Sequence, residues 1–244
     1  NIVDFMVMMP LGPRLTQLFA ITDAQFGLLV SAYTFASGAS GLVGASFIDR
    51  FDRRRALLFA YAMFALATLA CGLAASYEQL MTARVAAGIF GGALSALTQT
   101  LVAEWIPFER RGRAMGVVMT SFSLAAVAGV PLSLLLAARL SWHAPFFAIT
   151  LAIGVLWAVA WAVVPGLRSP QRPAPAAGRW VHAQVLADAN HRRAFLFSAL
   201  MLFSGFTIIP YLTLYAQINV GLTDDEVPVM YLCGGLATLF TSRW

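Results

Sequence analysis

The chain has 244 residues, of which 60% are hydrophobic and 11% are charged, and its mean hydropathy is +0.77. Since a soluble domain carries about 25% charged residues, this composition excludes a water-exposed surface over most of the chain and indicates a lipid environment. The formal net charge of +5 comes from 16 arginines without a lysine. These arginines lie in clumps between apolar runs, not on one solvated face, which argues against nucleic-acid binding.

Charge-free runs recur along the chain, and a membrane-spanning helix needs about 20 mostly apolar residues. An opening segment ends near Leu18, and a later run is interrupted only by Arg84. We therefore predict an all-α membrane protein with eight hydrophobic segments, the first and last incomplete, so that the chain is a piece of a longer protein. After the opening segment the runs cover residues 24–48, 56–75, 79–103, 114–138, 140–167, 194–223 and 227–242.

The connector 165–193 is longer than the other loops, and its Pro-rich part 169–178 is typical of a flexible linker. We expect three parts: an N-terminal six-helix bundle over residues 1–164 with a truncated first helix, a cytoplasmic linker over 165–193, and the truncated start of a second bundle over 194–244.

The connecting loops alternate in charge, which predicts the orientation of the chain. Twelve of the 16 arginines lie in three loops, whereas the loops on the other side carry Asp23, Glu78 and the acidic triplet 224–226, with Arg139 as their clearest basic residue. The positive-inside rule places the Arg-rich loops in the cytoplasm, so we expect a multi-pass protein with a cytoplasmic N-terminus. The use of arginine without lysine fits a bacterial genome of high GC content, so the expected location is a bacterial inner membrane. The twelve are Arg50, Arg53, Arg54, Arg55, Arg110, Arg111, Arg113, Arg168, Arg172, Arg179, Arg192 and Arg193.

No metal or cofactor site is indicated. Cys71 and Cys233 fall inside apolar runs as small hydrophobes, and the three histidines make no ligand spacing. The chain carries neither a Walker A loop, which argues against ATP as the energy source, nor a recognised catalytic constellation, which argues against an enzyme.

The loop after the second segment reads Gly44-Ala-Ser-Phe-Ile-Asp-Arg-Phe-Asp-Arg-Arg-Arg55. It resembles the signature loop of the major facilitator superfamily, although Ala45 and Asp52 stand where that family usually has glycine. Three further stretches are similar to family motifs in the fourth and fifth helices, and the last of them lacks the second glycine pair of the antiporter motif. These stretches are Arg84-x-x-x-Gly88-x-x-x-Gly92, residues 107–116, and Gly129-Val-Pro131.

The resemblance, most specifically to the arabinose-efflux-permease-like and drug:proton antiporter branch, implies a major facilitator fold of twelve helices. This chain would then hold the first six-helix bundle, helix 7 and part of helix 8. It also implies a monomeric secondary transporter that exports a sugar, drug or metabolite in exchange for protons. The alternatives are a facilitator or symporter of the same fold, a non-transporting membrane receptor, and a membrane-embedded enzyme.

Two charges are predicted to lie inside the bilayer, where each costs roughly 2.5–3.5 kcal/mol at the centre. Asp4 lies fourteen residues before Leu18, or about 21 Å along a straight helix, towards the cytoplasmic half. It is either a proton carrier or a structural acid. Arg84 either faces the cavity, where it tunes a nearby acid or contacts substrate, or snorkels to the outer interface.

The other candidate residues fall into three groups. Polar residues on apolar helices are expected to line the substrate cavity: Tyr33, Gln99, Thr120, Ser123 and Tyr211. Small or rigid residues are expected to pack helices together: Gly88, Gly92, Gly129 and Pro131. The resemblance implies that four charged residues form a cytoplasmic latch with the second bundle: Asp49, Arg50, Arg53 and Glu104.

Overall fold

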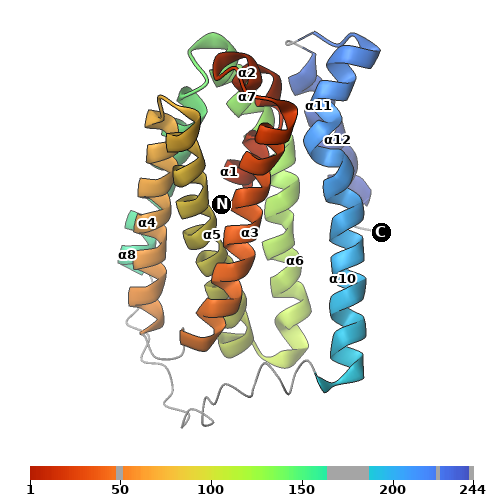
Figure 1. The fold of residues 1–244 in the computed structure, drawn as a ribbon. Helices are drawn as coiled ribbons and strands as arrows, with labels where there is room; N and C mark the ends of the chain where they lie inside the picture. Colours follow the sequence, from red (N-terminus) through yellow and green to blue (C-terminus); the bar gives the residue numbers. More distant parts are fainter. Residues whose placement is uncertain (48–51, 164–186, 224–225, 242–244) are drawn as a thin grey trace.

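The computed structural model describes residues 1–47, 52–163, 187–223 and 226–241. All regular structure in these ranges is helical, and most of the helices run side by side in one direction or its reverse (Figure 1). The predicted all-α fold is confirmed. The α-helices are α1 (Ile2–Val7), α2 (Gly12–Leu18), α3 (Asp23–Phe47), α4 (Arg53–Leu73), α5 (Tyr77–Trp105), α6 (Phe108–Leu124), α7 (Val130–Arg139), α8 (Ala144–Val163), α10 (Ala189–Ile208), α11 (Leu212–Tyr215) and α12 (Val227–Thr241).

Within the described ranges, four helices are long and apolar enough to cross a membrane: α3, α4, α5 and α8. They coincide with four of the predicted runs. The fifth run is divided between α6 and α7 by a π-helical turn, η2 (Ala125–Gly129). The seventh is divided by a 3-10 turn, η3 (Ile209–Tyr211), and by a second π-helical turn, η4 (Ala216–Val220). The number of membrane crossings therefore stays a prediction.

The opening segment is broken into α1 and α2 because of its prolines. Pro10 has no N–H to donate and its ring clashes with the carbonyl four residues earlier, so α1 ends at Val7 and the chain turns over Met8–Leu11. Pro13 stands in the first turn of α2, where its missing N–H needs no partner.

Polar side chains begin several helices. Asp52 accepts a hydrogen bond from the Arg55 N–H at 2.9 Å at the start of α4. Ser76 accepts from the Gln79 N–H at 3.3 Å at the start of α5. Both bonds satisfy N–H groups that a first helical turn leaves without partners. They fix where the long helices start, and hence the depth of the residues they carry.

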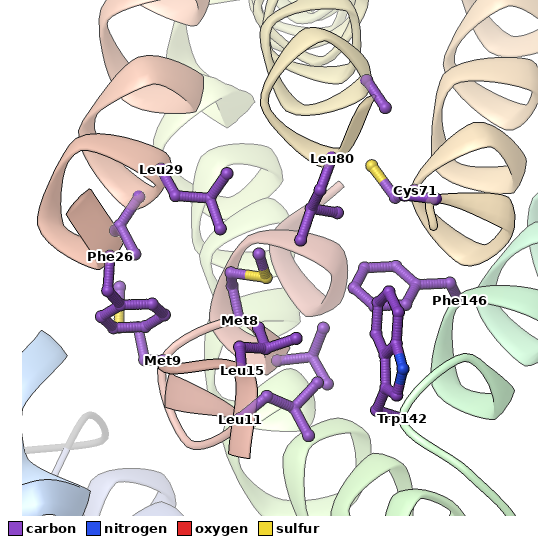
Figure 2. Close-up of a cluster of buried hydrophobic side chains, with 14 of the residues drawn as sticks. Met8, Met9, Leu11, Leu15, Phe26, Leu29, Cys71, Leu80, Trp142 and Phe146 are labelled. Atoms are coloured by element: carbon purple, nitrogen blue, oxygen red, sulfur yellow. The ribbon is translucent and has the colours of Figure 1, made fainter. Parts of the chain in front are cut away.

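One apolar cluster fills the end of the bundle where α2 lies (Figure 2). Met8, Leu11 and Leu15 pack between Leu29 of α3 on one side and Phe146 of α8 on the other. A second cluster surrounds Phe64 further along the bundle, between α3, α4, α5 and α8. Together the clusters hold α1 against α3, α5 and α8.

The helices α3 and α5 approach each other backbone to backbone. A Cβ atom at Gly88 would overlap the carbonyl oxygen of Tyr33, and one at Gly92 would overlap that of Ser37. Glycines at this spacing let membrane helices approach closely. The contact fixes the position of Tyr33 along α5.

The later helices contact the first part of the chain near one end of the molecule. The short α11 packs on α2, and α12 packs on α6, η2 and α7. By contrast, α10 stands at the edge of the molecule (Figure 1) and exposes apolar side chains such as Phe197, Met201 and Phe203. Most of the predicted linker, residues 165–186, lies outside the described residues, so the proposed division into two bundles stays a prediction.

Candidate functional site

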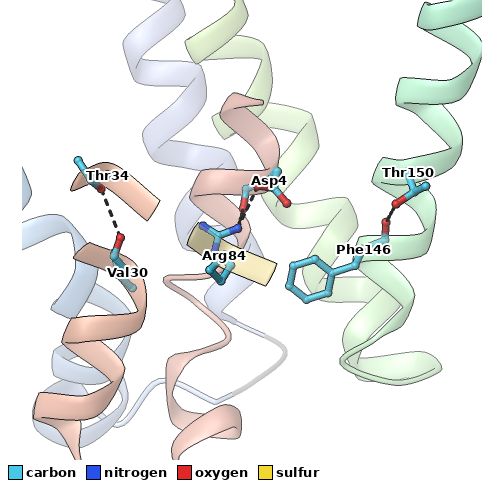
Figure 3. Close-up of polar contacts among 6 residues, drawn as sticks. All are labelled: Asp4, Val30, Thr34, Arg84, Phe146 and Thr150. Carbon is cyan, nitrogen blue, oxygen red and sulfur yellow. Dashed lines mark hydrogen bonds and ion pairs between the residues drawn. The ribbon is translucent and has the colours of Figure 1, made fainter. Parts of the chain in front are cut away.

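A buried ion pair joins α1 to α5. Nη1 of Arg84 lies 2.9 Å from Oδ2 of Asp4, and both side chains are 0% exposed. The same nitrogen donates to the backbone carbonyl of Asp4 at 3.3 Å (Figure 3). Arg84 was expected either to tune a nearby acid or contact substrate, or to reach the outer interface. The acid beside it is Asp4, which was expected to be either a proton carrier or a structural acid.

Aromatic side chains surround this pair. The ring centroid of Tyr33 lies 4.4 Å from Cζ of Arg84, a distance at which an aromatic face attracts a cation. Phe5, one residue after Asp4, stacks on Tyr33 with centroids 5.4 Å apart. Because Gly88 and Gly91 leave room for the backbone and the hydroxyl of Tyr33, the glycines of α5 determine where its ring meets Arg84.

The pair does not satisfy all of its own polar atoms. Within the described part of the chain, Oδ1 of Asp4 and both Nε and Nη2 of Arg84 are buried without a hydrogen-bond partner. A buried polar atom without a partner costs about 1–3 kcal/mol. The ion pair therefore offsets only part of the cost of burying these groups.

The pair lies closer to one end of the bundle than was expected for Asp4. Arg84 is seven residues from the start of α5, which is about 10 Å at the helical rise. This end is opposite the Arg-rich loops, whereas Asp4 was expected towards them. The expectation assumed a straight helix to Leu18, and the turn at Met8–Leu11 removes that assumption.

A cavity of about 170 Å³ adjoins Tyr33. Its hydrogen-bonding side chains come from α3, from α5 and from Asn1 just before α1, and Nδ2 of Asn1 donates to Oγ of Ser95 at 2.8 Å and to the carbonyl of Gly91 at 3.2 Å. The cavity is lined by Asn1, Ile2, Phe5, Tyr33, Thr34, Ser37 and Ser95. We call this the central cavity.

Of the five predicted cavity residues, Tyr33 is the one that lines the central cavity. Gln99 lies exposed on α5. Thr120 is exposed on α6 and donates to the carbonyl of Gly116 at 2.9 Å. The side chain of Ser123 lies outside the described residues. Tyr211 lies in η3, where its hydroxyl faces Gly27 of α3.

Sequence reasoning missed Thr34, Ser37 and Ser95 as cavity residues. Thr34 and Ser37 neighbour Tyr33 on the same stretch of α3. A run of hydroxyl side chains at positions 33, 34 and 37 on an otherwise apolar helix is the signal that could have identified them.

Two of the four predicted latch residues meet in the structure. Arg53 at the start of α4 holds Glu104 near the end of α5 through two bonds, Nη2–Oε1 at 2.6 Å and Nε–Oε2 at 3.2 Å. This is the paired geometry that guanidinium and carboxylate groups favour. Asp49 and Arg50 lie outside the described residues.

Two further groups can be located. Arg54, expected to serve orientation alone, also donates to the carbonyl of Trp161 at 2.6 Å. Gly129 lies in η2, where a Cβ atom would come within 2.7 Å of Val3, and Pro131 is buried at the start of α7. The glycine thus lies where α1 contacts η2, as a packing residue would.

Comparison with known families matches residues 1–244 to the Major Facilitator Superfamily. Among curated relatives, the uncharacterized MFS-type transporter YceJ of Bacillus subtilis (strain 168) is 26% identical over 70% of this chain and 43% of its own length. A probable sugar efflux transporter of Helicobacter pylori (strain HPAG1) is 24% identical over 92% of this chain and 58% of that protein. Multidrug resistance protein 3 of Bacillus subtilis (strain 168) is 31% identical over 54% of this chain and 26% of its own length.

Solved structures give the same fold. The bacterial homolog of the human lysosomal transporter Spinster, in an inward-facing and unoccupied conformation, superposes with a TM-score of 0.75 at 18% identity, over 100% of this chain and 60% of that chain. The D-xylose-proton symporter gives a TM-score of 0.70 at 18% identity, over 98% of this chain and 63% of that chain. The chain thus spans less than two thirds of the length of these proteins.

Proposed function

We propose, from the premise that this chain belongs to the Major Facilitator Superfamily, that the whole protein is a secondary transporter working by alternating access. Its family, apolar helices and bacterial relatives identify a multi-pass membrane protein. The finer proposal is proton-coupled export of a polar small molecule, a sugar or metabolite, across a bacterial inner membrane. The observation that carries it is the buried Asp4–Arg84 pair beside the central cavity.

The pair supports proton coupling through its charges. While Asp4 is ionised, it neutralises Arg84, which cannot lose its own proton. When Asp4 takes up a proton, Arg84 stays buried with an uncompensated charge, which is strongly unfavourable. Arg84 must then turn to another partner, such as a substrate oxygen. Proton binding and substrate binding would thereby be linked through one guanidinium group.

The central cavity supports a polar substrate. Hydroxyl groups of Tyr33, Thr34, Ser37 and Ser95 line it, and such groups orient ligands that offer several hydrogen-bonding atoms. Export is supported by two relatives whose names describe efflux or drug resistance. A facilitator or symporter of the same fold stays the alternative.

The charges at one end of the bundle support the orientation of the chain. We place the Arg-rich end in the cytoplasm on the positive-inside rule. The Arg53–Glu104 pair at that end would belong to the predicted latch, holding α4 and α5 together.

The test is proton movement in inverted vesicles that contain the whole transporter under an imposed proton gradient. Substrate-dependent proton release should occur with some members of a panel of sugars and amphipathic metabolites, and it should disappear in Asp4→Asn. The matched control is Glu226→Gln, which removes an exposed acid elsewhere and should leave the response intact.

Each other outcome has a meaning. An unchanged response in Asp4→Asn would move the proton site to another acid. Proton uptake in the same direction as the substrate would assign a symporter. No response of the folded wild-type protein to any compound would contradict proton-coupled export of this substrate class.

A further inference from the structure

A second cavity, of about 750 Å³, lies near the end of the molecule where α2 contacts α11. Its volume is within the range of small-molecule sites, about 300–1,000 Å³. Four parts of the chain wall it: α2, α7, the α11–η4 segment and the start of α12. We call it the outer cavity. It does not share a lining residue with the central cavity.

The outer cavity has one charged lining residue within the described part of the chain, Arg14 of α2. Nη1 of Arg14 donates to the carbonyl of Ala137, in the last turns of α7, at 2.6 Å. A guanidinium group carries five N–H donors, so this bond holds the group in place and leaves donors for a ligand. Arg14 is exposed, so a ligand can reach it.

The lining combines polar and apolar side chains. Gln17 stands one turn after Arg14 on α2, and Gln217 faces the cavity from η4. The apolar side chains of Leu11, Leu134 and Val227 form the rest of the surface together with alanines of α7. A ligand that fits this surface has one polar end and an apolar body.

Charges of both signs lie on the elements around the cavity among the described residues, so the charge that a ligand meets on the lining is that of Arg14. Arg139 follows the lining residue Ala138. Glu226 is not on the lining, and its carboxylate accepts hydrogen bonds from the N–H and hydroxyl of Thr223 at 2.8 and 2.9 Å. Asp23 lines a separate, smaller pocket of about 10 Å³. Residues 224 and 225 lie outside the described residues.

We propose that the outer cavity binds a small organic anion, with its carboxylate on Arg14 and its apolar part against Leu134 and Val227. Guanidinium groups bind carboxylates through paired, charge-assisted hydrogen bonds. The proposal goes beyond the proposed function, because binding at this site does not depend on which molecule crosses the membrane or on proton coupling.

The test measures binding of benzoate, benzamide and inorganic phosphate to the whole transporter in nanodiscs of zwitterionic lipid, without a gradient. Benzoate and benzamide have nearly the same shape, so their affinity ratio isolates the charge. Benzoate should bind about tenfold or more tightly than benzamide, the factor one charge-assisted hydrogen bond supplies. Phosphate, without an apolar part, should bind more weakly than benzoate.

The variants locate the site. Arg14→Gln should reduce the benzoate-to-benzamide ratio to near one, and Arg14→Lys should retain part of it. Arg139→Gln, at the same end but off the lining, should leave the ratio unchanged. A partial ratio in Arg14→Lys shows that the loss in Arg14→Gln reflects charge and not unfolding, and a monodisperse elution profile checks folding independently.

Three results would overturn the proposal. The first is equal binding of benzoate and benzamide to the wild-type protein. The second is a ratio unaffected by Arg14→Gln, which would place benzoate elsewhere, for example in the central cavity. The third is displacement of benzoate by phosphatidylglycerol in the nanodisc, which would assign Arg14 to an anionic lipid headgroup.

Discussion

Removing the charge of Asp4 while keeping its shape should destabilise the protein strongly. In Asp4→Asn the side-chain oxygen can still accept a hydrogen bond, and Arg84 keeps its 3.3 Å bond to the backbone carbonyl. The change therefore isolates the ionic part of the interaction. Arg84 is 0% exposed and has no route to water without moving α1.

The expected size follows from two independent estimates. Two charge centres about 4 Å apart attract by about 4 kcal/mol at an effective dielectric constant of about 20. Breaking a buried ion pair by removing one partner costs about 3–5 kcal/mol in measured cases. We expect Asp4→Asn to lower the free energy of unfolding by about 3–5 kcal/mol.

The reverse change should be milder. In Arg84→Gln the remaining carboxyl of Asp4 can bind a proton and become neutral, whereas a guanidinium stays charged. The double variant should lose less than the sum of the single losses, by about 0.5–3 kcal/mol.

The assay is reversible unfolding of the whole transporter in detergent micelles, followed by circular dichroism, for the four members of this double-mutant cycle. Arg139→Gln, which removes an exposed charge, serves as a control and should change stability by less than about 0.5 kcal/mol. A loss below about 1 kcal/mol in Asp4→Asn, or strictly additive losses in the double variant, would refute the reasoning, because surface ion pairs behave in this way.

Three further predictions concern other parts of the chain. Gly92→Ala should lower the thermal midpoint of unfolding, because the added methyl group meets the carbonyl of Ser37 and overpacking costs about 1–3 kcal/mol. Gly38→Ala, at a position with open space around it, should leave the midpoint unchanged. A lowered midpoint in both variants would contradict the proposed contact. Gly27→Val should separate Tyr211 from α3, because the hydroxyl of Tyr211 lies 3.2 Å from the position of a Cβ atom at residue 27. Spin-label distances between η3 and α3 should therefore be longer in Gly27→Val than in Gly38→Val. Equal distances in the two variants would contradict a contact between Tyr211 and Gly27. The pKa of Asp188 should be lower than that of a free aspartate because the backbone N–H groups of Asn190 and His191 donate to it. The stability that this carboxylate gives to the start of α10 is present above the unfolded-state pKa and lost as the pH falls through the folded-state pKa, where amide exchange at Asn190 should accelerate. A normal pKa of Asp188 in an NMR titration would contradict the cap.

The sequence predicts well what depends on one-dimensional patterns. Charge-free runs identify α3, α4, α5 and α8 because their lengths match a bilayer, and the motif around Gly88 and Gly92 identifies a close helix contact. Pro10 and Pro13 also carry the signal for the break in the first helix, but the run-based argument treated that segment as one helix.

Which side chains of different helices meet was beyond this reasoning. Asp4 and Arg84 are 80 residues apart, and hydropathy gives the depth of a residue but not the side of the helix on which it lies. Gln99 and Thr120 show the same limit, since both are polar residues on apolar helices and neither lines the central cavity. Tyr33 was predicted as a cavity residue from its polarity, whereas its contact with Arg84 depends on glycines of another helix.

The backbone contact between α3 and α5 has a mechanical consequence. With the carbonyls of Tyr33 and Ser37 seated on Gly88 and Gly92, these two helices cannot slide past each other without a collision, so they form a stiff strut. Displacement of the ion pair must then be taken up by α1, a six-residue helix with a proline turn behind it. Reporters of motion, such as a fluorophore or a spin label, belong on α1, and the strut offers the fixed reference against which that motion can be measured.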